Sequence, residues 1–263
     1  MGLACETVAG RVTNPSTTIT ALTANTGSTF TVRSFGQSAK AYIDQMWAHE
    51  ATAGLFRIRS PRMHDNSQGI RLQVGDTVPR LLMADANEQQ VYSSDTLTVE
   101  GTGGASETDF FAYNVYYTDL GGTAARLAQW AEISPRIVDI AGVEVDATTS
   151  GTAGDWSAGT ALNASFDTFK ADTDYALLGY TVGTVCGAVA VAGTDTGNLK
   201  IGGPGALDGI ENRQFFVNQA NRTGRPYIPI INANNRASTL LYVADPATST
   251  SVHVSLFLAQ LSQ

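Results

Sequence analysis

Apolar and polar residues alternate in short runs along most of the chain, and clusters of Gly, Asn, Asp and Pro separate these runs. In the stretch 110–118, every second residue from Phe111 to Tyr117 is aromatic or aliphatic. A period of two places successive side chains on opposite faces of a β-strand, whereas a helix requires a period near 3.6. Because long stretches with helical periodicity are nearly absent, the pattern predicts an all-β fold.

The first part of the chain contains seven segments with the length and composition of strands. They are rich in Val, Ile, Thr and aromatic residues, and turn-forming residues bound them. Their spacing is typical of a β-sandwich. The predicted strands are 30–35, 41–48, 55–59, 70–74, 81–84, 96–100 and 110–118.

The second part of the chain repeats the first in the same order, which predicts an internal duplication. Five runs match, and the alternation keeps its phase although few residues are identical. Loops between the runs differ in length, as expected where loops tolerate insertion and core strands do not. The matched runs are 54–60 with 187–193, 69–74 with 198–202, 81–87 with 228–234, 96–99 with 240–243 and 111–120 with 252–261. The predicted cores are Phe56, Ile58, Ile70, Leu72, Tyr113 and Val115 in one half and Val189, Val191, Leu199, Ile201, Val254 and Leu256 in the other.

The duplication predicts four consecutive segments. The segment before the first sandwich is polar and Thr-rich. The segment between the two sandwiches combines a short helix within 123–133 with a Gly-, Ser-, Thr- and Ala-rich stretch at 146–165. One or two helical turns are also expected at 211–220. The segments are an N-terminal arm 1–29, a first sandwich 30–120, a linker with a short helix 121–165 and a second sandwich 166–263.

Composition and charge argue against several classes of binding partner and of site. Only 15% of the residues are charged, and the formal net charge is −8 without any basic tail or patch, which argues against sequence-specific nucleic-acid binding. No run of 18 apolar residues occurs, and the N-terminus lacks the basic and apolar segments of a signal peptide, so we expect synthesis and assembly in a cytosol. Cys5 and Cys186 are far apart and neither lies in a C-x-x-C spacing, which argues against a disulfide framework or a zinc site.

The sequence offers no constellation for catalysis, and we expect no catalytic, cofactor-binding or metal-ligating residues. The three histidines, His49, His64 and His253, stand alone, whereas a duplicated metal-binding sandwich would carry an H-x-H pair and a downstream carboxylate. The tripeptide that begins at Asp195 is the one aspartic proteases use, but the repeat supplies no second carboxylate, and Asp and Gly also form turns. Asp172 and Asp174 lack the ligand number of a calcium loop.

One cluster of basic residues is a candidate contact site. Arg57, Arg59, Arg62 and His64 lie close together in the sequence, with Arg57 and Arg59 on one face of a predicted strand. Such a group can meet carboxylates of a neighbouring subunit or a polyanion at an inner surface. The alternative is an ordinary solvated strand face.

Two consecutive strand sets joined by a linker, together with the absence of catalytic groups, resemble the double jelly-roll major capsid proteins of tailless icosahedral viruses. This family includes adenovirus hexon and the coats of membrane-containing bacteriophages. The resemblance covers nearly the whole chain and implies two tandem jelly-roll sandwiches per subunit. It also implies a homotrimer of hexagonal outline that tiles a virion shell, with penton or minor capsid proteins and an internal membrane as further partners, and with assembly in the host cytoplasm.

Two points stay open at the level of sequence. Each half shows seven clear strands where a jelly roll has eight, so a seven-stranded immunoglobulin-like sandwich is an alternative. The alternative function is a virion decoration or fibre protein, or a carbohydrate-binding β-sandwich. Carbohydrate binders usually expose aromatic platforms, whereas Trp47, Trp130 and Trp156 are scattered along this chain.

Overall fold

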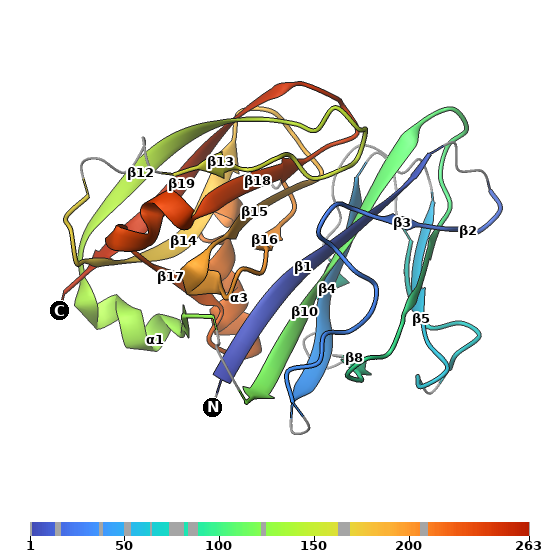
Figure 1. Ribbon diagram of the computed structural model, residues 1–263, viewed down its shortest axis with the longest axis horizontal. Coiled ribbons are helices and arrows are strands. Elements are labelled where there is room, and N and C mark those ends of the chain that lie inside the picture. The colour runs from blue at the N-terminus through green and yellow to red at the C-terminus, as the bar shows by residue number, and fades with distance from the viewer. Residues whose placement is uncertain are drawn as a thin grey trace.

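The protein is all-β and consists of two β-sandwiches that lie side by side along its long axis (Figure 1). Four antiparallel sheets form them, two from the first part of the chain and two from the second. The computed structural model describes residues 2–13, 17–36, 39–49, 54–63, 65–73, 82–83, 89–121, 125–162, 169–205 and 210–262.

The first sandwich, called the first roll below, comprises β1 to β10. Its larger sheet has the order β3-β1-β10-β4-β7, with β8 also paired to β4, and its smaller sheet has the order β2-β9-β5-β6. The strands are β1 (Gly2–Thr13), β2 (Thr20–Ala21), β3 (Thr23–Ala24), β4 (Lys40–His49), β5 (Leu55–Arg59), β6 (Ile70–Gln73), β7 (Leu82–Met83), β8 (Gln89–Val91), β9 (Thr98–Gly101) and β10 (Thr108–Leu120).

The second sandwich, the second roll, comprises β11 to β19, with the sheet orders β11-β17-β14-β19-β12 and β13-β18-β15-β16. Its strands are β11 (Leu127–Ala128), β12 (Ile137–Thr148), β13 (Thr160–Ala161), β14 (Asp174–Val182), β15 (Ala188–Ala192), β16 (Ile201–Gly203), β17 (Ile228–Asn232), β18 (Leu240–Ala244) and β19 (Ser251–Leu261). Short helices are α1 (Trp130–Ile133), α2 (Ile210–Arg213) and α3 (Phe215–Thr223), with 3₁₀ turns at Ser134–Arg136, Thr194–Thr196 and Ala233–Ser238.

The two rolls share one topology. The order β1-β10-β4-β7 in the first roll is repeated as β12-β19-β14-β17 in the second, and β2-β9-β5-β6 is repeated as β13-β18-β15-β16. Eight equivalent strands in two four-stranded sheets make each half a jelly roll. The described strands therefore decide between the two sandwich types in favour of the eight-stranded one.

The predicted cores are confirmed. Eleven of the twelve predicted side chains are buried, and the twelfth, Ile70, is half-buried against the same cluster. The alternation of strand residues accounts for this, because Tyr113 and Val115 on β10 and Val254 and Leu256 on β19 point between the sheets.

The match between β6 and β16 is shifted by two residues from the one expected. Ile58 pairs with Ile70, and its equivalent Val191 pairs with Ile201, so Ile70 corresponds to Ile201. Leu72 then corresponds to Gly203. A Cβ added at Gly203 would overlap the ring of Phe215, so the α3 phenylalanine occupies the space that Leu72 fills in the first roll.

The expected N-terminal arm is wrong for its first residues, because residues 2–13 form β1 in the middle of the larger sheet. Val8 and Val12 point into the first roll, while Cys5, Thr7 and Ala9 alternate with them and face the second roll. The small and weakly polar residues on the face of β1 toward the second roll make the segment look polar in the sequence. This face is buried by the second roll, and the sequence alone does not show that burial.

The expected linker is also wrong in part, because residues 137–148 form β12, the equivalent of β1. Val143, Val145 and Ala147 are buried and alternate with exposed charged residues. The segment 30–35 is not a strand, since only Thr31 makes an isolated bridge, to Thr96. The short helices expected near 123–133 and 211–220 are present as α1, α2 and α3.

Candidate functional site

The two rolls meet at a buried seam, formed by the outer face of β1, β10 and β4 against β15, β16 and β18 (Figure 1). Small side chains let the two sheets approach closely, and three large aromatic rings fill the remaining space. The indole nitrogen of Trp47 donates a hydrogen bond to the carbonyl of Gly187 at 2.9 Å. The cluster consists of Ala9, Trp47, Phe110, Ala112, Trp156, Ala188, Ala190 and Ala244.

Hydrogen bonds continue the seam beside this cluster. The backbone N–H of Gly202 donates to the hydroxyl of Thr7 at 2.9 Å, and the backbone N–H of Thr7 donates to the carbonyl of Lys200 at 2.7 Å. The amide of Asn114 donates to the Gly202 carbonyl at 3.1 Å and to the Tyr227 hydroxyl at 3.1 Å. Buried polar groups with specific partners fix one relative position, so the two rolls form one unit.

The seam also holds a buried thiol. Cys5 donates to the hydroxyl of Tyr227 at 3.3 Å. Burial, reinforced by the nearby Asp44 carboxylate, raises the pKa of Cys5 well above its usual value, so the thiol stays protonated and unreactive at neutral pH. Cys186 is also buried, and both cysteines are free thiols, which fits a structural role for each.

The predicted basic cluster separates into two parts. Arg57 and Arg59 both bind the carboxylate of Glu100 on β9, at 2.7 and 2.9 Å. The guanidinium of Arg62 instead lies 4.4 Å from the ring centre of Tyr92. His64 lies outside the described residues.

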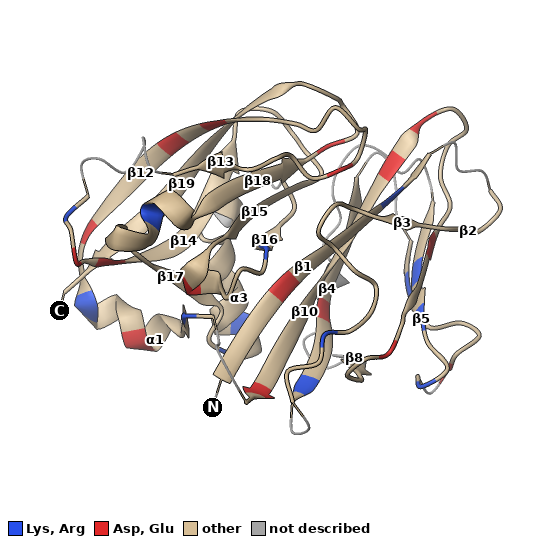
Figure 2. Ribbon diagram, in the orientation of Figure 1, with Lys and Arg blue, Asp and Glu red and all other residues tan. Residues whose placement is uncertain are grey.

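Two further residues, missed at the sequence level, complete this surface. Glu100 is the strand neighbour of Arg57 in β9, and Arg71 is its neighbour in β6. The hydrogen bond from Arg59, supported by Arg57, keeps the pKa of Glu100 below its usual value although the group is partly buried. Arg57 and Arg59 thus share the Glu100 carboxylate, while Arg71 donates a hydrogen bond to the carbonyl of Gln68. We call this outer side of β5, β6 and β9 the basic face, and Figure 2 shows the basic residues of β5 at one end of the molecule.

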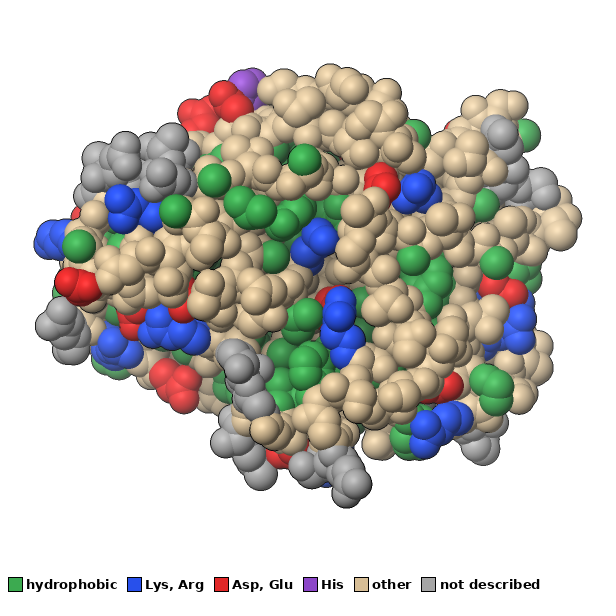
Figure 3. Space-filling model, viewed as in Figure 1, with side chains coloured by type: hydrophobic (Ala, Val, Ile, Leu, Met, Phe, Trp, Pro, Cys, Tyr) green, Lys and Arg blue, Asp and Glu red, His purple; other side chains and the backbone are tan. Residues whose placement is uncertain are grey.

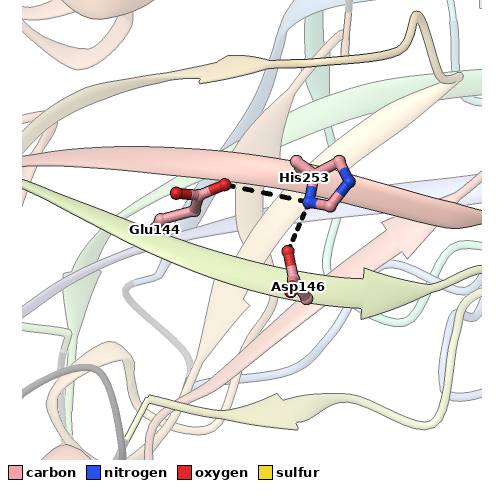
Figure 4. Close-up of side chains that lie close together, drawn as sticks. All are labelled: Glu144, Asp146 and His253. Atoms are coloured by element: carbon pink, nitrogen blue, oxygen red, sulfur yellow. Dashed lines mark hydrogen bonds and ion pairs between the residues drawn. The ribbon is translucent and has the colours of Figure 1, made fainter.

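A second charged group lies on the outer side of β12 and β19, and we call it the acidic face. Nδ1 of His253 lies 2.5 Å from a carboxylate oxygen of Asp146 and 3.8 Å from one of Glu144 (Figure 4). All three side chains are more than half exposed. The sequence showed His253 as isolated because its two neighbours lie more than 100 positions earlier, on the strand that pairs with β19.

The acidic face is the one place in the described part of the chain where three His, Cys, Asp or Glu donor atoms lie within 4.8 Å of one another. The imidazole lies between the two carboxylates in the manner of an ion pair, and strand pairing between β12 and β19 accounts for the proximity. All three side chains are more than half exposed, so no buried donor favours an ion at this group.

The acidic residues weighed for catalysis or cation binding have structural partners. Asp195 accepts hydrogen bonds from the backbone of Asn232 at 2.9 Å and the amide of Asn235 at 3.0 Å. Arg126 bridges Asp195 and Asp174, and it holds the pKa of Asp174 below its usual value. This network ties the 3₁₀ turn at Thr194–Thr196 to β14 and β17, as expected for turn residues.

The chain was compared with known families and structures. No family model and no curated protein matches it. Among solved structures, the PBSX exported protein XepA matches with 9% identity over 97% of this chain and 86% of that chain, at a TM-score of 0.29. A chain of the Sulfolobus Turreted Icosahedral Virus structure matches with 12% identity over 96% of this chain and 60% of that chain, at a TM-score of 0.27. BuGH86 in complex with neoagarooctaose gives 9% identity and a TM-score of 0.17.

TM-scores this low do not establish a shared fold, so the assignment rests on strand order and register within this chain. Among the described residues, no helix is long and apolar enough to cross a bilayer. Fold and surfaces define an all-β protein of two tandem jelly rolls joined by a buried seam, with an acidic face on the second roll and a basic face on the first.

Proposed function

We propose that this protein is a structural coat protein of a virus, which self-assembles through homotrimers into a closed shell. The proposal rests on one observation: each roll has both of the sheet faces that meet in the seam, so one copy could bind the next as its first roll binds its second. In the seam, the β1-β10-β4 face of the first roll packs on the β15-β16-β18 face of the second. The equivalent β12-β19-β14 face of the second roll and the β5-β6-β9 face of the first roll point away from the seam (Figure 1). The chain's own α2 packs on β14 beside Gly179, and the Arg213 guanidinium lies over the Phe257 ring of β19. The part of this face that stays exposed is therefore made by β12 and by β19 around His253.

Repetition of the seam between copies would use these two open faces. A head-to-tail contact between identical copies closes into a ring if its rotation allows, and otherwise forms a filament. Two similar rolls in each of three copies would give six comparable units around one axis. Such a trimer has a nearly hexagonal outline, which suits it to tiling a surface.

Exposed apolar residues on the second roll support the proposal. Among the described residues, four large apolar side chains are exposed, and two of them, Val138 and Ile140, lie on β12 with 58% and 55% of their surface exposed. Exposed apolar groups at one strand end favour an interface. We also propose that other virion proteins, such as penton or minor capsid proteins, join this shell, that the virus is a bacteriophage, and that assembly takes place in the host cytoplasm.

Light scattering and electron microscopy test the proposal. Purified protein is expected to show about three times the 27.7 kDa chain mass or a larger assembly, and images are expected to show hexagonal particles or shells. A monomer at the highest soluble concentration, without shells in fresh preparations, would overturn the proposal. That result would favour a decoration, fibre or carbohydrate-binding protein instead.

A further inference from the structure

We infer that the acidic face of one copy binds the basic face of the next, with Glu144 against Arg71 and Asp146 against Arg57. This inference rests on the proposed self-assembly and identifies the residues that carry it. It depends on the pseudo-symmetry of the two rolls, because the seam inside one chain shows which strand positions meet when one roll packs on another.

Strand register gives the seam equivalents of the acidic face. Val8 pairs with Tyr113 in the first roll, and the equivalent Val145 pairs with Val254 in the second. Counting along the strands from these pairs, Glu144 takes the position of Thr7, Asp146 that of Ala9, and His253 that of Ala112. Thr7, Ala9 and Ala112 are three of the residues through which the first roll contacts the second.

The same counting identifies the equivalents of the basic face. Ala190 pairs with Gly202 on one side and with Tyr242 on the other. In the first roll, Arg57 pairs with Arg71 on one side and Glu100 on the other. Arg57 therefore takes the position of Ala190, and Arg71 that of Gly202.

The contacts of the seam then predict the pairs between copies. Thr7 accepts a hydrogen bond from Gly202, so the equivalent residues Glu144 and Arg71 come together. Ala9 and Ala190 belong to one buried cluster, so the equivalent residues Asp146 and Arg57 fall in the same part of the contact. The Arg57 guanidinium is bound to Glu100 at 2.7 Å, so Asp146 meets an arginine that already has one carboxylate partner. The strand positions that carry neutral residues in the seam therefore carry acidic residues on the acidic face and basic residues on the basic face.

The charges on the two faces are complementary. The basic face has three guanidinium groups against the carboxylates of Glu100 and the nearby Asp65, and the acidic face has two carboxylates beside one imidazole. The two charged groups lie on different rolls, with acidic and histidine side chains together at the upper edge, left of the middle, in Figure 3, and β5 at the far right in Figure 2. Charge-assisted hydrogen bonds between guanidinium and carboxylate groups fix register, and complementary charge favours the correct partner over others.

The residue types in the seam and on the open faces also differ, as expected for a contact within one chain and a contact between copies. Alanine and glycine in the seam permit a permanent, dry contact formed once during folding. Charged side chains on the open faces keep an unassembled chain hydrated and hinder random pairing of its sheets. The neighbouring Ile140 takes the position of Leu3, which is half-buried against the core cluster, so apolar contact accompanies the ion pairs.

Charge reversal and charge exchange test the inference by measuring trimer formation with light scattering. Glu144→Arg alone and Arg71→Glu alone are each expected to weaken association by about tenfold or more, because each places like charges opposite each other. Glu144→Arg combined with Arg71→Glu in one chain is expected to restore association. Glu132→Arg makes the same charge change on exposed α1 outside both faces and is expected to leave association unchanged, so it serves as the matched control. Because Glu132 accepts a hydrogen bond from the backbone of Gln129 and caps α1, the stability of this control is measured as well.

Thermal unfolding of each variant checks that the fold persists, and Glu144→Gln and Arg71→Gln replace any variant that fails to fold. If the wild type forms trimers and both single-reversal variants form them equally well, the inference is overturned while the proposed function is left intact. Loss of trimers in both single variants without recovery in the combined variant would contradict the direct pairing. A wild-type protein that stays monomeric would instead overturn the proposed function.

Discussion

Individual polar side chains in the seam form hydrogen bonds with buried groups of both rolls, and these bonds hold the two rolls in one relative position. Asn114 shows this most clearly, because its buried amide contacts Gln45, Gly202 and Tyr227 and its carbonyl accepts from Thr7 at 2.7 Å. Loss of such a side chain therefore leaves several buried groups on both rolls without a partner.

Asn114→Ala is expected to destabilise the protein by about 1–3 kcal/mol, because it leaves the buried Thr7 hydroxyl and Gly202 carbonyl with fewer partners. Urea unfolding followed by tryptophan fluorescence measures the change. Asn66→Ala, in an exposed turn, is the control and is expected to change stability by less than about 0.5 kcal/mol. Equal effects of the two substitutions would contradict a special role for Asn114.

Glu100 gives the protein a predictable sensitivity to acid. Its pKa is lower in the folded protein than in the unfolded chain because Arg59 and Arg57 bind the charged form. The resulting stabilisation is present above the unfolded-state pKa, about 4.3 for Glu, and is lost as the pH falls through the lower folded-state value.

Glu100→Gln is therefore expected to destabilise the protein at pH 7 by about 1–3 kcal/mol and to reduce the loss of stability on acidification below about pH 4. Urea unfolding at a series of pH values measures both effects, with the exposed Glu132→Gln as control. A variant whose stability falls as steeply with acid as that of the wild type would show that Glu100 does not carry this dependence.

At the scale of strands, sequence periodicity located most elements but not all of them. β5 has one face in the core and shows clear alternation, so it was predicted correctly. β10 is buried on both faces and was still predicted, because bulky aromatic residues and Val115 mark it as a strand. β1 was missed because small or polar residues such as Thr7 and Ala9 occupy its seam face, so its composition does not show the burial of that face. The basic residues of β5 were identified, whereas the acidic face was not, because β12 and β19 meet through pairing of distant segments.

The proposed equivalence of Leu72 and Gly203 can be tested by moving a core side chain from α3 to β16. Phe215→Ala is expected to cost about 3–5 kcal/mol, because it empties the space above Gly203. Gly203→Leu alone is expected to destabilise by overlap with the ring. Together the two substitutions recreate the arrangement of Leu72 in the first roll, so the combined loss should be smaller than the sum of the single losses in urea unfolding. Simple additivity would count against the equivalence of Leu72 and Gly203.

At the scale of the whole molecule, the seam makes two jelly rolls one cooperative unit. Without it, each roll would expose a face of small apolar residues and unpartnered polar groups. Trp47 is the largest side chain in this contact, is fully buried and bonds across it to Gly187. The proposed role as a shell subunit requires such rigidity, because a fixed angle between the two rolls would set the angle between neighbouring copies.

Calorimetry of the isolated chain is expected to show one unfolding transition for the wild type, because the seam couples the two rolls. Trp47→Ala removes the central aromatic ring of the seam and the hydrogen bond to Gly187, at a cost of about 3–5 kcal/mol, so the transition should split into two. Trp130→Ala is the matched control, because it removes the same side chain from a partly exposed site on α1 and should lower stability without splitting the transition. A single transition in Trp47→Ala would mean that the remaining seam contacts suffice for coupling, and two transitions in the wild type would mean that the rolls fold independently.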